Sequence, residues 1–259
     1  MSIHPSSIIH PSSKIDSSVE IGPFCTIGAD VEIGKGSRII SHVVLKGPTI
    51  IGDNNTIFQF ATIGDDTPDK KYKGEKTKLV IGNNNIFREG VTVHRGTIQD
   101  QGVTTIGSNN LFMAYSHIAH DCIVGNDNIF ANLAGIAGHV CIGNNVNVGA
   151  ITTVHQFCKM GDFSFAGMNT SITMDVPAFV KVASDPARVI GLNSIGMKRN
   201  DIDEESVSLM KKAYKLLYRK NLKIEEALIK IKELQNISKD PYLEIFIKSI
   251  EVSERGILR

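Results

Sequence analysis

Aliphatic side chains recur along this chain every six residues, separated by polar and small residues. The first series of these positions consists of Ile3, Ile9, Ile15, Ile21, Ile27, Ile33, Ile39, Leu45, Ile51, Ile57 and Ile63. Four residues after each of them stands a small or β-branched side chain, with Asn55 as the exception. A helical period of 3.6 would scatter these side chains around an axis, whereas six is a multiple of the two-residue period of a strand. The pattern therefore predicts short extended segments, each with one inward aliphatic residue, joined by corners.

The period resumes at Ile81, Phe87 and Val93, and a second series, displaced by one residue, follows. It consists of Ile106, Phe112, Ile118, Val124, Phe130, Ile136, Ile142, Val148, Val154, Met160, Ala166 and Ile172. Two polar stretches, near residues 65–80 and 96–105, break the rhythm. Because neither keeps the inward aliphatic pattern, we expect both to project as loops, and loops on a rigid scaffold are good candidates for function. An ordinary β-sandwich would instead show period two with no preferred sixth residue.

The repeat over residues 3 to about 177 resembles the hexapeptide-repeat acyltransferase superfamily. In that superfamily three hexapeptides form one coil, and the coils stack as a left-handed parallel β-helix of triangular section. The resemblance therefore implies a β-solenoid in which each coil buries its aliphatic column on the next. The left hand is taken from the resemblance, since connections between parallel strands are otherwise almost always right-handed.

After Pro177 the six-residue period fades, and from about Asp203 the hydrophobic spacing becomes helical. Val207, Met210 and Ala213 begin a series at spacings of three and four, and residues 224–235 and 241–250 continue the helical pattern. We therefore divide the chain into a left-handed parallel β-helix over residues 1–187, with its projecting loops, and a C-terminal α-helical domain over residues 188–259. The second part carries a net charge of +4 and the first −3, so the helices are mildly basic.

Composition and charge exclude several classes of protein. The 259 residues carry a net charge of only +1 at pH 7, which leaves no strong case for a nucleic-acid binder. No segment approaches the roughly 18 uncharged apolar residues that a membrane span needs, so we expect no integral membrane segment. The first residues lack the basic start and apolar run of a secretory signal, and four Cys are too few for a disulfide scaffold. A cytoplasmic protein is expected.

Four of the eight histidines fall within a short part of the repeat: His117, His120, His139 and His155. They belong to hexapeptides that lie three repeats apart, so they should stack on one face, with coils about 4.8 Å apart. A cluster of imidazoles on one face suits two chemistries. One is a metal site with His117 and His120 as ligands, as in the zinc-dependent carbonic anhydrases of this fold. The other is acyl transfer with one imidazole as the base.

The segments around these histidines resemble one family within the superfamily. AYSHIAHDCIVG, GIAGHVCIG, TTVHQFCKMG and VTVHRGT are closely similar to segments of the UDP-N-acetylglucosamine acyltransferases, and the likeness extends to the final RGILR. The resemblance implies the first enzyme of lipid A biosynthesis, which transfers a (R)-3-hydroxyacyl chain from acyl carrier protein to the 3-position of a UDP-sugar. It also implies a homotrimer with active sites in the grooves between chains, and neither cofactor nor metal.

The resemblance implies catalytic roles for His120, Asp121 and Gly138. His120 matches the general base, and a neutral imidazole suits that role at neutral pH. Asp121 matches the carboxylate that orients this imidazole. Adjacent side chains on a straight strand point to opposite faces, so this pairing requires the chain to bend. Gly138 matches the backbone N–H that stabilises the oxyanion of the thioester.

Further positions match substrate-binding residues of the family. Those expected at the acceptor sugar or the acyl chain are Asp69, Lys71, His117, His139, His155 and Gln156. Asn193 and Arg199 match positions near the uridine and the phosphates, and the fork of an Arg can bind two phosphate oxygens. Met168 lies where the family gauges acyl length, so we expect it to close the groove and to select a medium-length chain.

Three positions depart from the common family pattern. Ile195 stands where an acidic residue is usual, Asn200 replaces the second Arg of a pair, and Pro68 replaces a polar residue beside Asp69. These changes leave open whether the acceptor carries a 3-hydroxyl or a 3-amino group, and hence whether an ester or an amide forms.

Other hypotheses use the same residues differently. Cys122 could be a nucleophile beside His120, but like Cys25 and Cys158 it falls on the small inward position, which favours a structural role. A zinc-dependent carbonic anhydrase-like enzyme and a non-catalytic β-solenoid binding module are the alternatives outside acyl transfer. The N-acyltransferase that acts later in lipid A synthesis carries an extra N-terminal domain, and the repeat beginning at Ile3 argues against it.

Overall fold

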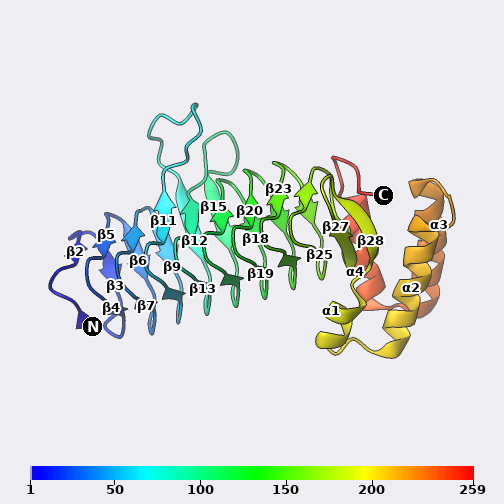
Figure 1. Cartoon of the computed structure of the whole chain (residues 1–259), viewed down its shortest axis with the longest axis horizontal. Helices are drawn as coiled ribbons and strands as arrows, with labels where there is room; N and C mark the ends of the chain where they lie inside the picture. The colour runs from blue at the N-terminus through cyan, green and yellow to red at the C-terminus, as the bar shows by residue number, and fades with distance from the viewer. Residues whose placement is uncertain (1) are drawn as a thin grey trace.

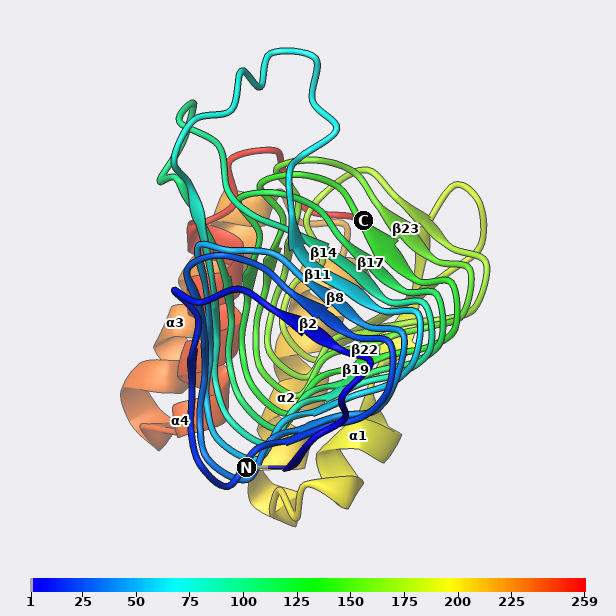
Figure 2. The same ribbon diagram turned by 90° about the vertical axis from the view of Figure 1, so that its left-hand side faces the viewer.

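The chain winds into a left-handed parallel β-helix that is followed by α-helices. The computed structural model describes residues 2–259. Each coil passes through three short strands, which stack in three faces around a triangular section (Figures 1 and 2). Most strands of the described chain contain only two residues, because each hexapeptide uses its other residues to turn a corner. The predicted fold class is confirmed.

The strands of the three faces alternate along the chain. Face 1 consists of β1 (Ser2–Ile3), β4 (Glu20–Ile21), β7 (Arg38–Ile39), β10 (Thr56–Ile57), β13 (Ile86–Phe87), β16 (Leu111–Phe112), β19 (Ile129–Phe130), β22 (Asn147–Val148), β25 (Phe165–Ala166), β27 (Val180–Ala183) and β28 (Arg188–Leu192). Face 2 consists of β2 (Ile8–Ile9), β5 (Thr26–Ile27), β8 (Val44–Leu45), β11 (Thr62–Asp65), β14 (Thr92–His94), β17 (His117–Ile118), β20 (Gly135–Ile136), β23 (Thr153–Val154) and β26 (Ser171–Ile172). Face 3 consists of β3 (Lys14–Ile15), β6 (Val31–Ile33), β9 (Thr49–Ile51), β12 (Lys78–Ile81), β15 (Val103–Ile106), β18 (Ile123–Val124), β21 (Cys141–Ile142) and β24 (Lys159–Met160).

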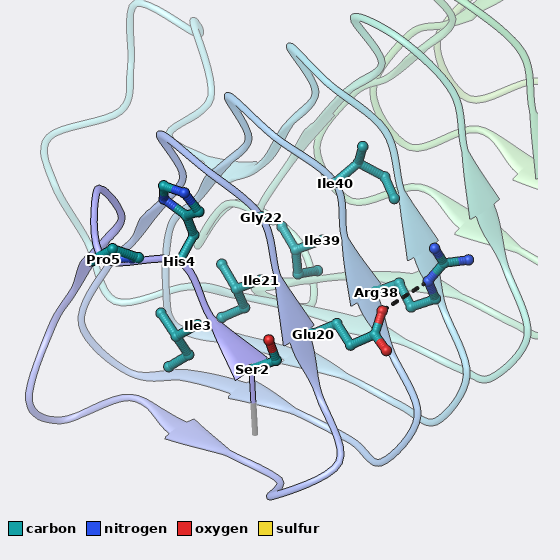
Figure 3. Close-up of a pocket in the computed structure, with 10 residues that line it drawn as sticks. All are labelled: Ser2, Ile3, His4, Pro5, Glu20, Ile21, Gly22, Arg38, Ile39 and Ile40. Atoms are coloured by element: carbon teal, nitrogen blue, oxygen red, sulfur yellow. Dashed lines mark hydrogen bonds and ion pairs between the residues drawn. The ribbon is translucent and has the colours of Figure 1, made fainter.

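The core is the stacked aliphatic column that the six-residue period predicts. Neighbouring strands pair in parallel with partners 18 residues apart, as Ile3 does with Ile21. From Ile21 to Ile172, every member of both predicted series is at most 3% exposed. Figure 3 shows the first rungs, where Ile3, Ile21 and Ile39 follow one another while Glu20 and Arg38 form an ion pair of 3.2 Å outside them.

The Asn that interrupts the small inward positions begins a buried ladder. The side-chain oxygen of Asn55 accepts hydrogen bonds from the backbone and side-chain nitrogens of Asn85, at 2.9 and 3.0 Å. Asn85 accepts in the same way from Asn110, whose oxygen accepts from the backbone of Asn128. Each side-chain oxygen thus accepts hydrogen bonds from N–H groups of the next coil. Because these buried polar groups are paired, Asn is tolerated inside the solenoid.

Most corners are turned by a residue whose φ lies near +60°, in the left-handed region. Between face 3 and face 1 many of these residues are the Asn and Asp that tolerate this conformation best, namely Asn54, Asn84, Asn109, Asp127 and Asn145. The corner between face 1 and face 2 carries larger side chains instead: Phe24, His42, Phe60, Tyr115, Leu133 and Ile151. We call this second corner the apolar corner.

Two loops leave the third corner, between face 2 and face 3, which we call the site corner. Residues 66–77 connect β11 to β12, and residues 95–102 connect β14 to β15; both extend from the same edge of the prism (Figures 1 and 2). Strand partners beside them are 30 residues apart at Thr56 and Ile86, and 25 apart at Thr92 and His117, instead of 18. Both loops are therefore insertions that leave the stack of coils intact.

The solenoid ends in the antiparallel pair β27 and β28, after which the chain becomes helical. The helices are α1 (Ser194–Arg199), α2 (Glu204–Tyr218), α3 (Ile224–Ser238) and α4 (Pro241–Glu251). Asp203 caps α2 by accepting from the backbone of Ser206 at 2.9 Å, and Asp240 caps α4 by accepting from Leu243 at 2.7 Å. The helical spacing thus predicted the three longer helices, but not α1. None of the helices in residues 2–259 combines the length and apolar character needed to cross a bilayer.

The C-terminal segment, residues 252–259, returns to the end of the solenoid. The N–H of Asp175 donates to the carbonyl of Gly256 at 3.0 Å, and the N–H of Leu258 donates to the carbonyl of Asp175 at 2.8 Å. The buried Asp175 carboxylate accepts from the backbone of Lys159 and from the hydroxyl of Ser253, each at 2.7 Å. The end of the chain is thereby fixed beside the site corner.

Candidate active site

A polar cavity of about 730 Å³ lies at the site corner. Its walls come from four separate parts of the chain. They are the first loop (Asp69, Lys71), the second loop (Thr97, Gln99, Asp100), the corner residues of three coils (His120, His139, Gln156, Phe157, with Lys159) and the C-terminal segment (Glu254, Arg255). Five of the predicted site residues thus meet here, namely Asp69, Lys71, His120, His139 and Gln156, because both insertions and the stacked coils share one corner.

His120 and Asp121 form a hydrogen-bonded pair although they are neighbours in the chain. Nδ1 of His120 lies 2.9 Å from Oδ2 of Asp121. Asp121 is a corner residue with a φ of +57°, so the chain turns here and both side chains reach the same side. The bend that the pairing requires is therefore present. The imidazole is 16% exposed and the carboxylate only 1%.

The carboxylate of Asp121 is held by the second loop. It accepts from the backbone N–H of Thr97 at 2.8 and 3.0 Å and from the hydroxyl of Thr97 at 2.6 Å. Burial alone would raise the pKa of Asp121, but the hydrogen bonds from His120 and Thr97 bring it below its ordinary value. Because an ionised carboxylate only accepts, Nδ1 of His120 carries the proton and Nε2 of the neutral ring keeps its lone pair.

Gly138 lies directly against the His120 ring. A Cβ at Gly138 would come within 2.5 Å of Cε1 and 2.6 Å of Nε2, so no other residue fits without moving the imidazole. The neighbouring N–H groups of Ala137 and His139 donate to the carbonyls of Val154 and His120. The hydrogen bonds within residues 2–259 give the N–H of Gly138 no acceptor, which leaves it free for a ligand beside the base.

His139 is fixed on several sides. Its ring stands edge-on to that of His120, with centroids 5.0 Å apart and an interplanar angle of 89°. Its face stacks on Phe157 at 4.5 Å and 10°. Its Nδ1 lies 2.8 Å from Oδ2 of Asp100 in the second loop.

The other two predicted histidines occupy different surroundings. His117 lies 2.7 Å through Nδ1 from the hydroxyl of Thr92 and contacts the ring of His94 at 4.9 Å. Burial lowers the pKa of His117, and the nearby His120 adds to that effect. His155 is exposed and has its Nδ1 3.1 Å from the carbonyl of Gln156, so Phe157 and not His155 contacts His139. The predicted cluster therefore holds for His120 and His139, whose rings are in contact, and for His117, which lies near enough to His120 for the two charges to interact. His155 stands apart from it.

The first loop is held by Arg95, the first residue of the second loop. Its guanidinium is buried and donates to the carbonyl of Gly64, to the carboxylate of Asp66 and, at 3.1 Å, to the hydroxyl of Tyr72. The Tyr72 hydroxyl in turn donates to Asp66 at 2.9 Å. The segment between these two contacts carries Asp69 and Lys71, so Arg95 anchors both ends of it.

Three predicted residues lie away from this cavity within the single chain. Asn193 caps α1, where it accepts from Gly196 at 3.1 Å and donates to the carbonyl of Phe163 at 2.8 Å. Arg199, with Ile195 and Asn200, lines a second cavity of about 510 Å³ on the face 1 side. Met168 is 69% exposed next to the apolar corner.

One group of side chains has the composition of a cation site. Ligand atoms of His120, Asp121 and His139 all lie within 4.8 Å of one another. The Asp121 carboxylate, however, already accepts three hydrogen bonds from Thr97 and one from His120, and Nδ1 of His139 is engaged by Asp100. These side chains are thus arranged as two hydrogen-bonded imidazole–carboxylate pairs, His120 with Asp121 and His139 with Asp100.

Comparison with known proteins assigns the chain to a family. Residues 175–258 match the model described as UDP-N-acetylglucosamine O-acyltransferase, domain 2. Residues 104–138 match the bacterial transferase hexapeptide model, and residues 3–101 match the GMPPB C-terminal domain model. A protein of Stutzerimonas stutzeri named acyl-[acyl-carrier-protein]–UDP-N-acetylglucosamine O-acyltransferase is 50% identical over 257 residues, which cover 99% of each chain. This chain belongs to the UDP-N-acetylglucosamine O-acyltransferase family.

Solved structures agree with this membership. The UDP-N-acetylglucosamine O-acyltransferase of Moraxella catarrhalis superposes with a TM-score of 0.97 at 44% identity, covering 100% of both chains. The UDP-N-acetylglucosamine acyltransferase of Francisella novicida has a TM-score of 0.94 at 42% identity, covering 99% of this chain and 94% of the other. The chain is therefore an enzyme, an acyltransferase, and the carbonic anhydrase-like and non-catalytic alternatives find no support.

In this member of the O-acyltransferase family, Cys122 is structural. The side chain is fully buried, and burial raises the pKa of its thiol to about 12, so a thiolate nucleophile is disfavoured. Cys25 and Cys158 are buried as well, as their inward positions predict.

Sequence reasoning missed several residues of the acyltransferase site. Thr97 donates to the Asp121 carboxylate, Asp100 and Phe157 contact the imidazole of His139, and Arg95 anchors the first loop. Thr97 and Asp100 lie in the stretch that was expected to project as a loop, which was the only signal available. For Arg95 the signal is a charged residue two positions after the inward Val93, where strand alternation points it to the inside.

Proposed function

We propose that the site corner carries out the family's reaction, the first step of lipid A biosynthesis. An acyl chain passes from the thioester of acyl carrier protein directly to the 3-position of UDP-N-acetylglucosamine. The observation that carries this proposal is the His120–Asp121 pair beside the unpaired N–H of Gly138, at the edge of a cavity reached by both loops.

In this mechanism His120 is the general base. Nε2 takes the proton from the sugar hydroxyl as its oxygen attacks the thioester carbonyl, while Asp121 stabilises the imidazolium that forms. The carbonyl π electrons move onto oxygen, and the N–H of Gly138 donates to that oxyanion. When the tetrahedral intermediate collapses, the C–S bond breaks and the imidazolium returns the proton to the departing sulfur. Atoms and charges balance without a cofactor.

The remaining site residues have roles in holding the substrates. Asp69 and Lys71 on the first loop, with His139 and Gln156 on the coils, surround the same cavity as the base and bind the acceptor sugar. His117 lies in β17 of face 2, and His155 directly follows β23 of the same face. Both stand beside the path that an acyl chain would take from the site corner toward Met168 near the apolar corner.

The active oligomer is proposed to be a homotrimer, and the apolar corner supports this. Phe24, Phe60, Tyr115 and Leu133 are between 54% and 63% exposed there. Ile151 is β-branched and has a φ of +59°, a conformation that costs an L-residue roughly 1–2 kcal/mol. Exposed apolar side chains in a strained conformation along one whole edge are explained if copies of this chain meet at that edge.

This arrangement completes the site with a second chain. If the apolar corner points to the symmetry axis, face 1 of each chain opposes face 2 of the next. The second cavity, with Asn193 and Arg199, then faces the histidines of the neighbouring chain. Arg199 binds the phosphates of the UDP-sugar, and Asn193 lies near the uridine.

The experiment is an assay of acyl transfer with product identification. Purified protein is incubated with 3-hydroxyacyl thioesters of acyl carrier protein and with UDP-N-acetylglucosamine or its 3-amino analogue. We expect an ester with UDP-N-acetylglucosamine. A strong preference for the 3-amino analogue would show instead that the acceptor group is an amine.

His120→Ala tests the general base within the same assay. Turnover should fall roughly 10²–10⁴-fold, the usual contribution of general base catalysis, while the oligomer and melting temperature stay unchanged. His10→Ala, which removes an exposed imidazole from an early coil of face 2, is the matched control and should keep full activity. Retained turnover in His120→Ala would end the general-base assignment.

A further inference from the structure

The second loop holds both imidazole–carboxylate pairs of the cavity. Thr97 binds the Asp121 carboxylate that orients His120, and three residues later Asp100 binds His139. The loop is closed on itself by the N–H groups of Asp100 and Gly102, which donate to the carbonyl of Thr97 at 3.3 and 3.0 Å. One short closed turn therefore presents a hydroxyl to the first pair and a carboxylate to the second.

Asp100 determines which nitrogen of His139 carries the proton. Its carboxylate is 39% exposed, and the imidazole of His139 is 13% exposed. Because an ionised carboxylate only accepts, the neutral ring must keep its proton on Nδ1 at the 2.8 Å contact. Nε2 is then the acceptor nitrogen of the neutral ring.

The ring has little freedom to turn away from this arrangement. Phe157 stacks on one of its faces, and His120 meets it edge-on. With Nδ1 bound by Asp100, Nε2 is the ring nitrogen left for a ligand in the cavity. A sugar hydroxyl that donates to Nε2 of His139 would lie next to the base, because the centroids of the two imidazoles are 5.0 Å apart.

We propose that Asp100 is a positioning residue for the acceptor sugar, acting through His139. It holds the imidazole in the Nδ1–H tautomer, so that Nε2 accepts a hydrogen bond from a sugar hydroxyl beside His120. This inference rests on the proposed function of the same site.

The test compares two alanine substitutions in the same loop. Asp100→Ala removes the carboxylate, and Gln101→Ala truncates the exposed neighbouring residue as the matched control. The tautomer of His139 is determined by long-range proton–nitrogen NMR on protein labelled in its histidines, with the His139→Gln spectrum used for assignment. The Kd for UDP-N-acetylglucosamine is measured by calorimetry on the same samples.

We expect His139 to carry its proton on Nδ1 in the wild type and in Gln101→Ala, and mainly on Nε2 in Asp100→Ala. The Kd for the UDP-sugar should rise about tenfold in Asp100→Ala only, the loss expected when a hydrogen bond to a ligand is no longer aligned. In the transfer assay the same factor should appear in KM, with kcat changed much less, because His120 and Asp121 keep their contacts.

An unchanged tautomer in Asp100→Ala would overturn the inference, and so would a changed tautomer with an unchanged Kd. Both measurements are independent of turnover. If the wild type bound the UDP-sugar but transferred no acyl chain, the proposed reaction would fail while the tautomer and Kd still decided the role of Asp100.

Discussion

At the scale of single residues, the conformation of Asp121 matters as much as its charge. Side chains of sequence neighbours on a straight strand point to opposite faces. The φ of +57° at Asp121 turns the chain, so that its carboxylate meets the ring of His120. The six-residue period already implies a corner near this position, so the bend could be anticipated. The partner that buries the carboxylate, Thr97, lies 24 residues earlier and could not.

A residue-scale prediction concerns the pH dependence of stability. Burial, with a smaller contribution from His117, lowers the pKa of His94 to about 4 from an ordinary value of 6.5. Between these values the unfolded chain binds a proton that the folded imidazole does not, so stability should fall as the pH drops below 6.5. The full effect is at most about 3 kcal/mol.

Denaturant unfolding of the wild type and of His94→Gln at pH 7, 5.5 and 4.5 measures this effect. The variant should lose part of the acid dependence, whereas His10→Gln, at an exposed position, should keep all of it. Equal slopes for wild type and His94→Gln would contradict the assignment.

A second residue-scale prediction concerns donor length. The side chain of Met168 stands exposed beside the apolar corner, where the proposed groove across face 2 ends. Met168→Gly should open that end and shift the preference toward longer acyl chains, with each methylene worth roughly 1–3 kcal/mol. The relative kcat/KM for thioesters of increasing length measures the shift. An unchanged donor profile would count against Met168 as the gauge.

At the scale of elements, the decisive fact is that both insertions leave one corner. The interruption of the six-residue period shows in the sequence where each insertion lies. Contacts made by the loops, such as that of Asp100 with His139, 39 residues apart, depend instead on how the inserted chain folds over the coils. The helices show the same division. Three- and four-residue spacing predicts α2, α3 and α4, whereas the six residues of α1 are too few to establish a period.

An element-scale prediction concerns the anchor of the first loop. Arg95→Met keeps the length of the side chain but removes the donors to Gly64, Asp66 and Tyr72. The loop should loosen, so that Asp69 and Lys71 hold the acceptor less well and KM for the UDP-sugar rises about tenfold. Limited proteolysis should show faster cleavage within residues 66–77.

Arg38→Met serves as the control, because Arg38 makes an exposed ion pair with Glu20 at the far end of the solenoid. It should leave both KM and the cleavage rate unchanged. Wild-type values of both quantities in Arg95→Met would show that the loop does not depend on this anchor.

At the scale of the whole molecule, the corners of the prism differ in the type of residue that turns them. Asn and Asp turn many steps of the corner between faces 3 and 1, where water can solvate them. Large apolar residues turn the apolar corner in the same backbone conformation, at a cost that a solvent-facing edge would not require. The contrast between the two corners is the strongest sign in a single chain of an assembly.

The prediction at this scale is that Leu133→Asn combined with Ile151→Asn abolishes the proposed trimer. Asn tolerates the left-handed conformation, so each chain should stay folded while the apolar contact is lost. Light scattering after size exclusion should give the mass of one chain. Turnover should be lost because, in the proposed trimer, Arg199 completes the site of a neighbouring chain. Asn109→Gly, at the corner between faces 3 and 1, should remain trimeric. A double variant that remained trimeric would show that the apolar corner is not the interface between chains.

The sequence by itself determined the solenoid, its inward column, the two insertions and the longer helices, because each of these follows from a local period that every repeat expresses. It also indicated which histidines share a stack of coils, since their spacing follows from the same period. Only the tertiary structure decided that Thr97 reaches the Asp121 carboxylate and Asp100 the imidazole of His139. It also decided that Phe157 takes the place expected for His155, and that Arg199 lines a separate cavity beside face 1. Those contacts depend on loop closure and on the direction of side chains at corners, neither of which is repeated along the chain.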